Sequence, residues 1–310
     1  MKKKSNIKFI SVVAASVFSM SILLSGCGSS SSETSKDSSS AATTPATTEA
    51  AKTTASVSGS ITSLGSTAIQ QLVKEAADNF MSKNSGASIQ VQGGGSGTGL
   101  TQVSSGGADI GNSDIFAEEK LPADKAKELV DHKVCVVGFA AVVNPGVKVD
   151  NLTQKQLVDV FTGKIKNWKE LGGDDQEIVI VNRPASSGTR ATFKKYALNG
   201  ADEAQGKALT EDSSGTVKKV VADTKGAISY LALSYIDNTV KALKYEGTEA
   251  NPENIAAGKY PIWSYEHMYT KGEPKDLAKA FLDYIMSSDV QNTIVKKLKF
   301  IPISDMKTSR

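Results

Sequence analysis

Cysteine and histidine are scarce in this chain, which has two of each in 310 residues. Two cysteines cannot build a disulfide framework. The two histidines, at positions 132 and 267, are too few and too far apart for a histidine-rich metal site, and they leave little for a Ser-His-Asp triad. We therefore expect neither a metal nor a cofactor. Cys135 lies in the apolar run 134–137 and is expected to be a small buried side chain.

An excess of one charge is also lacking. The chain has 36 Lys and Arg against 33 Asp and Glu, but four of the lysines lie in the first 26 residues, which contain no acid. The remainder has 32 basic and 33 acidic side chains, a balance of −1. Bulk charge therefore does not indicate a nucleic-acid partner.

A long hydrophobic run is missing as well. The most apolar stretch, 9–24, follows a lysine-rich start, is interrupted by serines, and is too short for a comfortable transmembrane helix. The sequence Leu24-Ser25-Gly26-Cys27 resembles the lipobox of bacterial lipoproteins, in which the signal peptide is cut before the cysteine and that cysteine is acylated. We expect residues 1–26 to be a lipoprotein signal peptide and Cys27 to carry the lipid. An ordinary signal peptide with a chance cysteine is the alternative.

Residues 27–57 are expected to form a disordered tether that starts at the lipidated cysteine. Ser, Thr and Ala occupy 22 of the 30 positions from 28 to 57. Such a segment buries too little apolar surface to offset the entropy lost on ordering. The folded part is then expected outside the cytoplasm, anchored to the cell membrane by its lipid.

The rest of the chain alternates strand-like and helix-like segments. We expect strands at 58–63, 87–92, 108–113, 133–143, 177–182, 226–231 and 261–269, and helices at 68–84, 98–105, 123–131, 153–161, 188–198, 217–223 and 274–297. Thr153 and Gln156 fit a capping box. This alternation predicts an α/β fold with mostly parallel sheets, in which ligands bind at the carboxyl ends of strands and at helix N-termini.

Four loops rich in Gly with Ser or Thr follow predicted strands. They are Gly65-Ser66-Thr67-Ala68, residues 93–99, Gly111-Asn112-Ser113-Asp114, and residues 183–190. Three of them open a helix, where unpaired N–H groups and the helix dipole favour an anion. Together with Arg183 and Arg190 they could form a cage for a tetrahedral oxyanion. Taken singly, each loop is equally well an ordinary helix cap or turn.

Asp114 is the exception among these donors, because an acid should repel an anion. A carboxylate is useful there if the anion carries a proton that it can accept, as phosphate does near neutral pH and sulfate does not. A carboxylate that accepts this proton would favour phosphate and reject sulfate. The alternatives are that Asp114 caps a turn or pairs with Arg183.

These loops are part of a longer set of motifs that resembles a known protein family. Its motifs occur in order across residues 58–303: Gly65-Ser66-Thr67, Gly95-Ser96-Gly97, Gly111-Asn112-Ser113-Asp114, Arg183 with Ser187-Gly188-Thr189-Arg190, Gly226-Ala227-Ile228-Ser229-Tyr230 and Phe300-Ile301-Pro302. With this set the chain resembles the phosphate-binding proteins of ABC-type phosphate importers (PstS type). The resemblance implies a two-lobed type II periplasmic-binding-protein fold, with a two-crossover hinge and a ligand cleft between the lobes. The first lobe would comprise 58–140 plus 264–310, and the second 141–263.

The resemblance also implies a set of phosphate-binding residues. They are Ser66, Thr67, Ala68, Ser96, Gly97 and Asp114 from the first lobe, and Arg183, Ser187, Gly188 and Thr189 from the second. The protein would act as a monomer that delivers inorganic phosphate to an importer permease and ATPase complex, without making or breaking a bond. Members of the family often carry an acid shortly after the arginine, where this chain has Ala185 and Ser186. The orientation of Arg183 is therefore open, with Asp114 as one candidate partner.

Three other functions compete with this interpretation. A secreted serine hydrolase would use Ser187, but neither histidine has an evident partner acid in the sequence. A binding protein for another oxyanion is the second alternative. Asp114 argues against sulfate and molybdate and does not separate phosphate from arsenate. A phosphate sensor that is not coupled to transport is the third.

Overall fold

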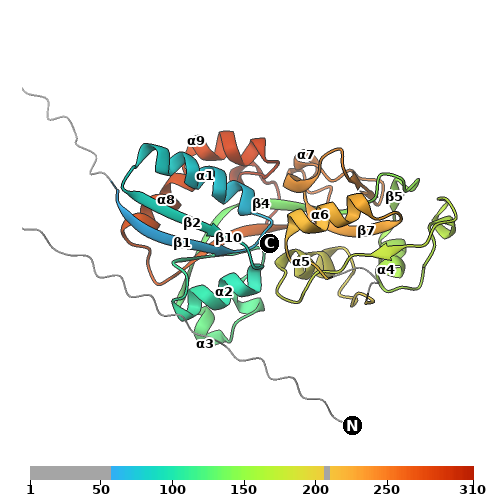
Figure 1. Cartoon of the computed structure of the whole chain (residues 1–310), viewed down its shortest axis with the longest axis horizontal. Helices are drawn as coiled ribbons and strands as arrows, with labels where there is room; N and C mark the ends of the chain where they lie inside the picture. The colour runs from blue at the N-terminus through green and yellow to red at the C-terminus, as the bar shows by residue number, and fades with distance from the viewer. Residues whose placement is uncertain (1–56, 206–209) are drawn as a thin grey trace, which may run out of the picture. The chain divides into compact units, whose positions relative to one another are not determined.

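The computed structural model describes residues 57–205 and 210–310 (Figure 1). The predicted signal peptide 1–26, the lipidation site Cys27 and the tether up to residue 56 lie outside the described residues. The strands are β1 Gly59–Gly65, β2 Ala87–Gln92, β3 Ile110–Ser113, β4 Leu129–Val143, β5 Asn151–Leu152, β6 Val179–Ile180, β7 Ala227–Ala232, β8 Lys241–Ala242, β9 Lys244–Tyr245 and β10 Trp263–Lys271. The α-helices are α1 Gln70–Lys83, α2 Ser96–Ser105, α3 Ala123–Ala126, α4 Gln154–Phe161, α5 Gly188–Tyr196, α6 Ser214–Asp223, α7 Pro252–Ala256, α8 Asp276–Ile285 and α9 Ser288–Val290.

One sheet connects the two halves of this fold, in the strand order β2-β1-β3-β10-β4-β7-β6, with β8 paired to β4. The long strand β4 is shared: its residues up to Gly138 pair with β10, and Phe139–Val143 pair with β7. The Phe139 amide donates to the carbonyl of Ile262, just before β10 begins. The chain thus passes between the halves along β4 and returns at the start of β10, and we call the halves the first lobe (β1–β3, α1–α3, α8, α9) and the second lobe (α4–α7, β5–β9).

In the first lobe, helices cover both faces of the strands. Helices α1 and α8 lie on one side and α2 and α3 on the other (Figure 1). The apolar stripe of α1, from Leu72 to Phe80, is buried, and the Phe80 ring contacts Phe281 of α8 edge-on at 5.8 Å. On the α2 side, Leu100 and Val103 form a separate small core with Tyr269 of β10. The strands between these layers are therefore held from both faces, which fixes the loops at their carboxyl ends.

The second lobe is built around β7. The Tyr230 ring on this strand stacks on Phe193 of α5 at 4.3 Å, and Phe161 of α4 completes the cluster. Trp168 is buried and its Nε1 donates to the Gly226 carbonyl at 3.0 Å. Helix α4 begins with the expected capping box, in which Thr153 Oγ1 accepts from the Gln156 amide and Gln156 Oε1 accepts from the Thr153 amide.

Three sequence-based expectations of local structure are wrong. The sheet is mixed rather than mostly parallel, since β10 runs antiparallel to β3 and β4, and β4 antiparallel to β7. The helix expected at 123–131 ends at Ala126, because residues from Leu129 pair with the end of β10. The helix expected at 274–297 is interrupted: α8 ends at Ile285, and Ser287 caps a new helical segment by accepting from the Val290 amide.

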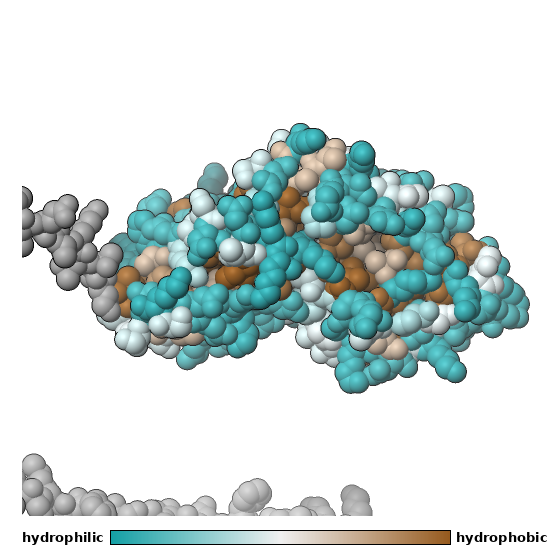
Figure 2. Space-filling model, turned by 90° about the horizontal axis from the view of Figure 1, so that it is seen from above, coloured by the Kyte–Doolittle hydropathy of each residue, from teal (hydrophilic) through white to brown (hydrophobic). Residues whose placement is uncertain are grey.

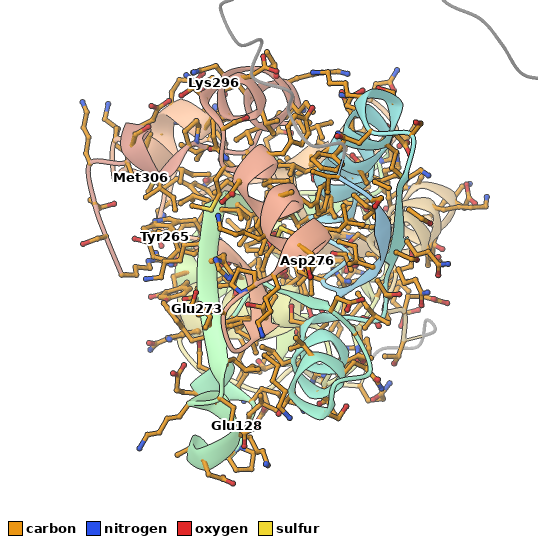
Figure 3. All side chains as sticks on the ribbon, turned by 90° about the vertical axis from the view of Figure 1, so that its left-hand side faces the viewer. Glu128, Tyr265, Glu273, Asp276, Lys296 and Met306 are labelled. Atoms are coloured by element: carbon orange, nitrogen blue, oxygen red, sulfur yellow. The ribbon has the colours of Figure 1, made fainter. Side chains whose placement is uncertain are left out.

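Cys135 is fully buried in β4, as expected, and burial raises the pKa of its thiol well above the ordinary value. The face seen from above is largely covered by hydrophilic residues, with hydrophobic residues showing in patches between them (Figure 2). Seen from the first-lobe end, Glu128 lies beside the start of β4 and Lys296 lies in the C-terminal helical layer (Figure 3). Within the two described ranges, helices long and apolar enough to cross a bilayer do not occur.

Candidate anion-binding cleft

The first loop of the cleft leads from β1 into α1. Gly65 has φ 143°, and a Cβ at this position would lie 2.2 Å from the Asn112 carbonyl oxygen, so only glycine fits between β1 and β3. Ser66 Oγ accepts from the Ala68 amide at 3.0 Å and donates to Asp114 Oδ1. The close approach of the two strands therefore fixes the Ser66 hydroxyl and the Ala68 N–H beside the Asp114 carboxylate.

The second loop ends at Gly95, which caps α2 with φ 81°. Ser96, the first residue of the helix, is fully buried, and its Oγ accepts from the Asp114 amide at 2.9 Å. The Gly97 amide donates across the cleft to the carbonyl of Ser186 at 2.9 Å. Gly97, whose N–H is a predicted ligand contact, is thus engaged with the second lobe in this structure.

Asp114 lies at the centre of the cleft, directly after β3, and is 2% exposed. Its Oδ1 accepts from Ser66 of the first lobe, and its Oδ2 accepts from Thr189 Oγ1 of the second lobe at 2.9 Å. The partners of its carboxylate are hydroxyls from both lobes. Asp114 therefore neither serves as a simple turn cap nor depends on Arg183 for its orientation.

Arg183 contributes the positive charge and is 1% exposed. Its Nη2 donates to Thr67 Oγ1 at 3.1 Å and to the Asp212 carbonyl, and its Nη1 donates to Ser214 Oγ at 3.3 Å. Its Nε has no partner among the described residues. Burial lowers the pKa of Arg183, while nearby acidic groups, Asp114 and Asp212 among them, raise it. The guanidinium remains charged, because its pKa starts far above neutrality.

Asp212 and Ser214 are the site residues that sequence reasoning missed. They precede and open α6. Arg183 donates to the main-chain carbonyl of Asp212, and the charge of the Asp212 side chain acts on Arg183. Burial raises the pKa of Asp212, the Arg183 charge lowers it, and the Asp114 charge raises it. The signal was available, because residues 213–216 read Ser-Ser-Gly-Thr, the same composition as the other helix-opening loops.

The N-terminus of α5 brings the second lobe against the first. Ser187 caps the helix by accepting from the Arg190 amide at 3.2 Å. A Cβ on Gly188 would lie 2.1 Å from Ser96 Oγ, so the two lobes meet here with no room for a side chain. Arg190, expected in the cage, instead donates to the Arg183 carbonyl at 2.7 Å and thereby supports that residue's backbone.

All ten predicted site residues are buried and converge on one place. The first-lobe residues Ser66, Thr67, Ala68, Ser96, Gly97 and Asp114 face the second-lobe residues Arg183, Ser187, Gly188 and Thr189. Direct hydrogen bonds cross between the lobes, so the structure describes a closed cleft. A closed, buried site with several donors, one guanidinium and one carboxylate suits an oxyanion that carries a proton.

The same geometry does not assemble a hydrolase. His267 does have an acidic partner, contrary to the sequence-based expectation, since its Nδ1 lies 2.8 Å from Asp131 Oδ1. The Ser187 hydroxyl, however, serves the α5 cap rather than a histidine. His267 and Asp114 both line a small cavity of about 20 Å³, roughly the space of one water, and Ser187 is not among the residues that line it. Groups of three or more metal-ligating side chains are not found within the two described ranges.

Two lobes joined by β4 and β10 around a buried polar cleft define the class of type II periplasmic binding proteins. Similar solved structures support this assignment of the fold. A phosphate ABC transporter substrate-binding protein from Clostridium perfringens, crystallised with bound phosphate, superposes with a TM-score of 0.72 at 31% identity and covers 79% of this chain and 100% of its own. An ABC-type phosphate transport receptor from Vibrio cholerae gives a TM-score of 0.62 at 28% identity, with 79% and 100% covered. The two-lobed fold expected from the sequence is confirmed.

Sequence relatives define the family. Residues 50–289 match the PBP superfamily domain. The phosphate-binding protein PstS of Bacillus subtilis is 60% identical over 254 residues, which are 82% of this chain and 84% of that protein. PstS of Borreliella burgdorferi is 27% identical over 64% of this chain and 77% of its own length. The chain belongs to the PstS family of phosphate-binding proteins, and it is thus a binding protein rather than an enzyme.

Proposed function

We propose that the protein captures inorganic phosphate outside the cytoplasm and delivers it to an ABC-type importer. The observation that carries this proposal is the Asp114 carboxylate, which is buried among hydroxyl and amide donors and lies in the same closed cleft as the Arg183 guanidinium. A site for a fully ionised anion has no use for that carboxylate, whereas a protonated phosphate donates to it.

Each predicted site residue has a proposed role. The hydroxyls of Ser66, Thr67, Ser96, Ser187 and Thr189 and the amides of Ala68, Gly97 and Gly188 donate to phosphate oxygens, Arg183 neutralises its charge, and Asp114 accepts its proton. Several of these donors bond to one another in the closed cleft, as Ser66 and Thr189 do with Asp114. On ligand binding these hydroxyls would turn toward the anion, and the Gly97 amide would leave the Ser186 carbonyl to do the same.

Closure of the cleft is proposed to be a hinge motion along the two crossovers. We propose lobe boundaries at 58–140 plus 264–310 and at 141–263. They are supported by the change of β4 partners between Gly138 and Phe139 and by the return of the chain before Trp263. Phosphate bridges donors from both lobes only when they meet, so it favours the closed state. The closed surface would then dock on the permease and ATPase complex.

Attachment to the membrane is the part of the proposal that rests on the sequence alone. We propose that Cys27 carries the lipid and that the Ser, Thr and Ala-rich segment after it is a tether. The protein would thus work as a monomer, lipid-anchored on the extracytoplasmic face of the cell membrane. Mass spectrometry of the N-terminal peptide from native membranes tests this: an acylated Cys27 supports the anchor, and an unmodified N-terminus elsewhere contradicts it.

Isothermal titration calorimetry on protein freed of phosphate tests the binding function. We expect tight phosphate binding, and sulfate binding weaker by at least about a thousandfold, on the order of 4 kcal/mol, since sulfate leaves Asp114 without a donor and adds a like charge. Equal affinities for the two anions, or no binding of phosphate, would contradict the proposal.

A further inference from the structure

Glu266 is a buried acid next to Asp114 of the proposed phosphate site. It lies in the middle of β10 with 0% exposure, and its carboxyl oxygens accept no hydrogen bond from a donor group among the described residues, while the Asp114 carboxyl group lies within hydrogen-bonding reach. On one side it pairs with Cys135 of β4. On the other side His267 pairs with Ser113, so the next position along β3 places Asp114 beside Glu266.

The strand geometry brings the two acids to the same face of the sheet. Paired residues on neighbouring antiparallel strands point to the same side. Glu266 therefore lies between Cys135 and Asp114, in one row across three strands. Asp114 presents its carboxylate to the cleft, and Glu266 approaches that carboxylate from the core.

The titratable groups around Glu266 offer it no positive charge. They are Asp114 at the end of β3, the Cys135 thiol on β4, and the Tyr235 hydroxyl, which donates to the Thr67 carbonyl at 2.8 Å. Burial raises the pKa of Glu266 well above its ordinary value, and the charge of Asp114 raises it further. Burying an unpaired carboxylate next to a second one is far costlier than burying the neutral acid.

We propose that Glu266 is a neutral carboxylic acid that donates its proton to the Asp114 carboxylate and holds that carboxylate toward phosphate. It is a positioning residue for the proposed phosphate site, and the inference rests on that function. Asp114 has room for this bond, because an ionised carboxylate has about four lone-pair sites. Without ligand, Ser66 and Thr189 take two of them; when these hydroxyls turn to phosphate, the proton of phosphate takes one, so a site remains for Glu266 in both states.

The proposal has a functional consequence. An acid that donates to Asp114 leaves that group aimed at the ligand and adds no charge to the site. If Glu266 lost its proton, two adjacent buried carboxylates would face an incoming anion, and phosphate affinity would fall. Glu266 would thus set the upper end of the pH range in which the protein captures phosphate.

Two variants separate positioning from a merely structural role. Glu266→Gln keeps the shape and an N–H donor for Asp114, whereas Glu266→Met fills the space without a donor. We expect Glu266→Gln to bind phosphate within about threefold of the wild-type affinity. Glu266→Met should lose at least about tenfold in affinity, which corresponds to the lower end of the free-energy range for one hydrogen bond to a charged group. We also expect Glu266→Met to stay folded at the assay temperature, because an apolar side chain of similar length fills the space of the buried acid.

Infrared spectroscopy tests the protonation state without relying on folding of the Met variant. At neutral pH the wild type should show the carbonyl band of a protonated carboxylic acid, the band should shift when inorganic phosphate is added, and it should vanish in Glu266→Gln. A missing band, a band that phosphate leaves unchanged, or a Glu266→Met protein that binds phosphate as the wild type does would overturn the inference. Failure of the wild type to bind phosphate would instead overturn the proposed function.

Discussion

Replacing Gly188 with alanine should block closure of the cleft while leaving each lobe intact. Gly188 is the first residue of α5, and its backbone has no left-handed φ that would strain an alanine. The added Cβ would lie 2.1 Å from Ser96 Oγ, 2.7 Å from Ser96 Cβ and 3.0 Å from Asp114 Cβ. All three atoms belong to the first lobe, so only separation of the lobes relieves the overlap.

The size of the effect follows from the contacts that need both lobes. Carbon and oxygen atoms require more than 3 Å between them, so the lobes must move apart by about 1 Å or more at Gly188. Arg183 and Thr189 would then no longer reach a ligand seated in the first lobe. Loss of two charge-assisted hydrogen bonds, at about 1.5–3 kcal/mol each, lowers phosphate affinity by roughly 10²- to 10⁴-fold.

Calorimetric titration with phosphate measures this loss, and Gly215→Ala provides the matched control. Gly215 also lies in the first turn of a second-lobe helix, α6, but the nearest atom to its Cβ would be Ser213 Oγ at 3.7 Å. We expect Gly215→Ala to bind phosphate as the wild type does, and both variants to retain the wild-type melting temperature within a few degrees. If Gly188→Ala binds phosphate with unchanged affinity, direct contact of the lobes at this point is not needed for binding.

Three further predictions follow from the buried polar groups. Ser214→Ala removes a hydrogen bond to the Arg183 guanidinium, and phosphate affinity measured by calorimetry should fall by roughly three- to thirtyfold; unchanged affinity would refute the orienting role. Burial raises the pKa of Glu266 in the folded state above its ordinary 4.5. The neutral acid's contribution to the free energy of unfolding is therefore fully present below pH 4.5. Between pH 4.5 and the folded-state pKa, it decreases by about 1.4 kcal/mol per pH unit. Urea titrations of the wild type should therefore show this loss relative to Glu266→Gln, and parallel pH profiles would contradict it. The Cys135 thiol is buried with a raised pKa, so a thiol reagent should label it only under unfolding conditions, and rapid labelling of the native protein would disprove its burial.

Local patterns predicted the elements whose limits are set by nearby residues. The strand expected at 87–92 is β2 to the residue, and the capping box at Thr153 starts α4 as expected. These features depend on alternation of apolar residues and on side chains three positions apart, both of which the sequence displays directly.

Features set by distant pairing were predicted poorly. Residues 129–131 were predicted to end a helix, yet they extend β4, because β10 offers them partners more than 130 positions later in the chain. The direction of β10 relative to β3 and β4 follows from the route of the chain between lobes, which local periodicity does not encode.

In the candidate site, too, residues marked by local composition were predicted, and residues whose role depends on distant neighbours were missed. The glycine-rich loops and Asp114 stood out by composition, and the structure brings them together. Asp212 and Glu266 did not stand out, because their importance comes from neighbours far away in the sequence: Arg183 for Asp212, and Asp114 for Glu266. An acid becomes informative only when its burial and its surroundings are known.

The ratio of phosphate to sulfate affinity in Asp114→Asn is the most direct measurement of the central claim. An asparagine keeps the shape of Asp114, removes its charge, and can donate a hydrogen bond to an unprotonated oxyanion as well as accept one. We predict that calorimetry will show weaker phosphate binding, stronger sulfate binding, and a ratio at least about tenfold smaller than that of the wild type. An unchanged ratio would show that the carboxylate does not sense the proton of the ligand, and the account of selectivity would be wrong.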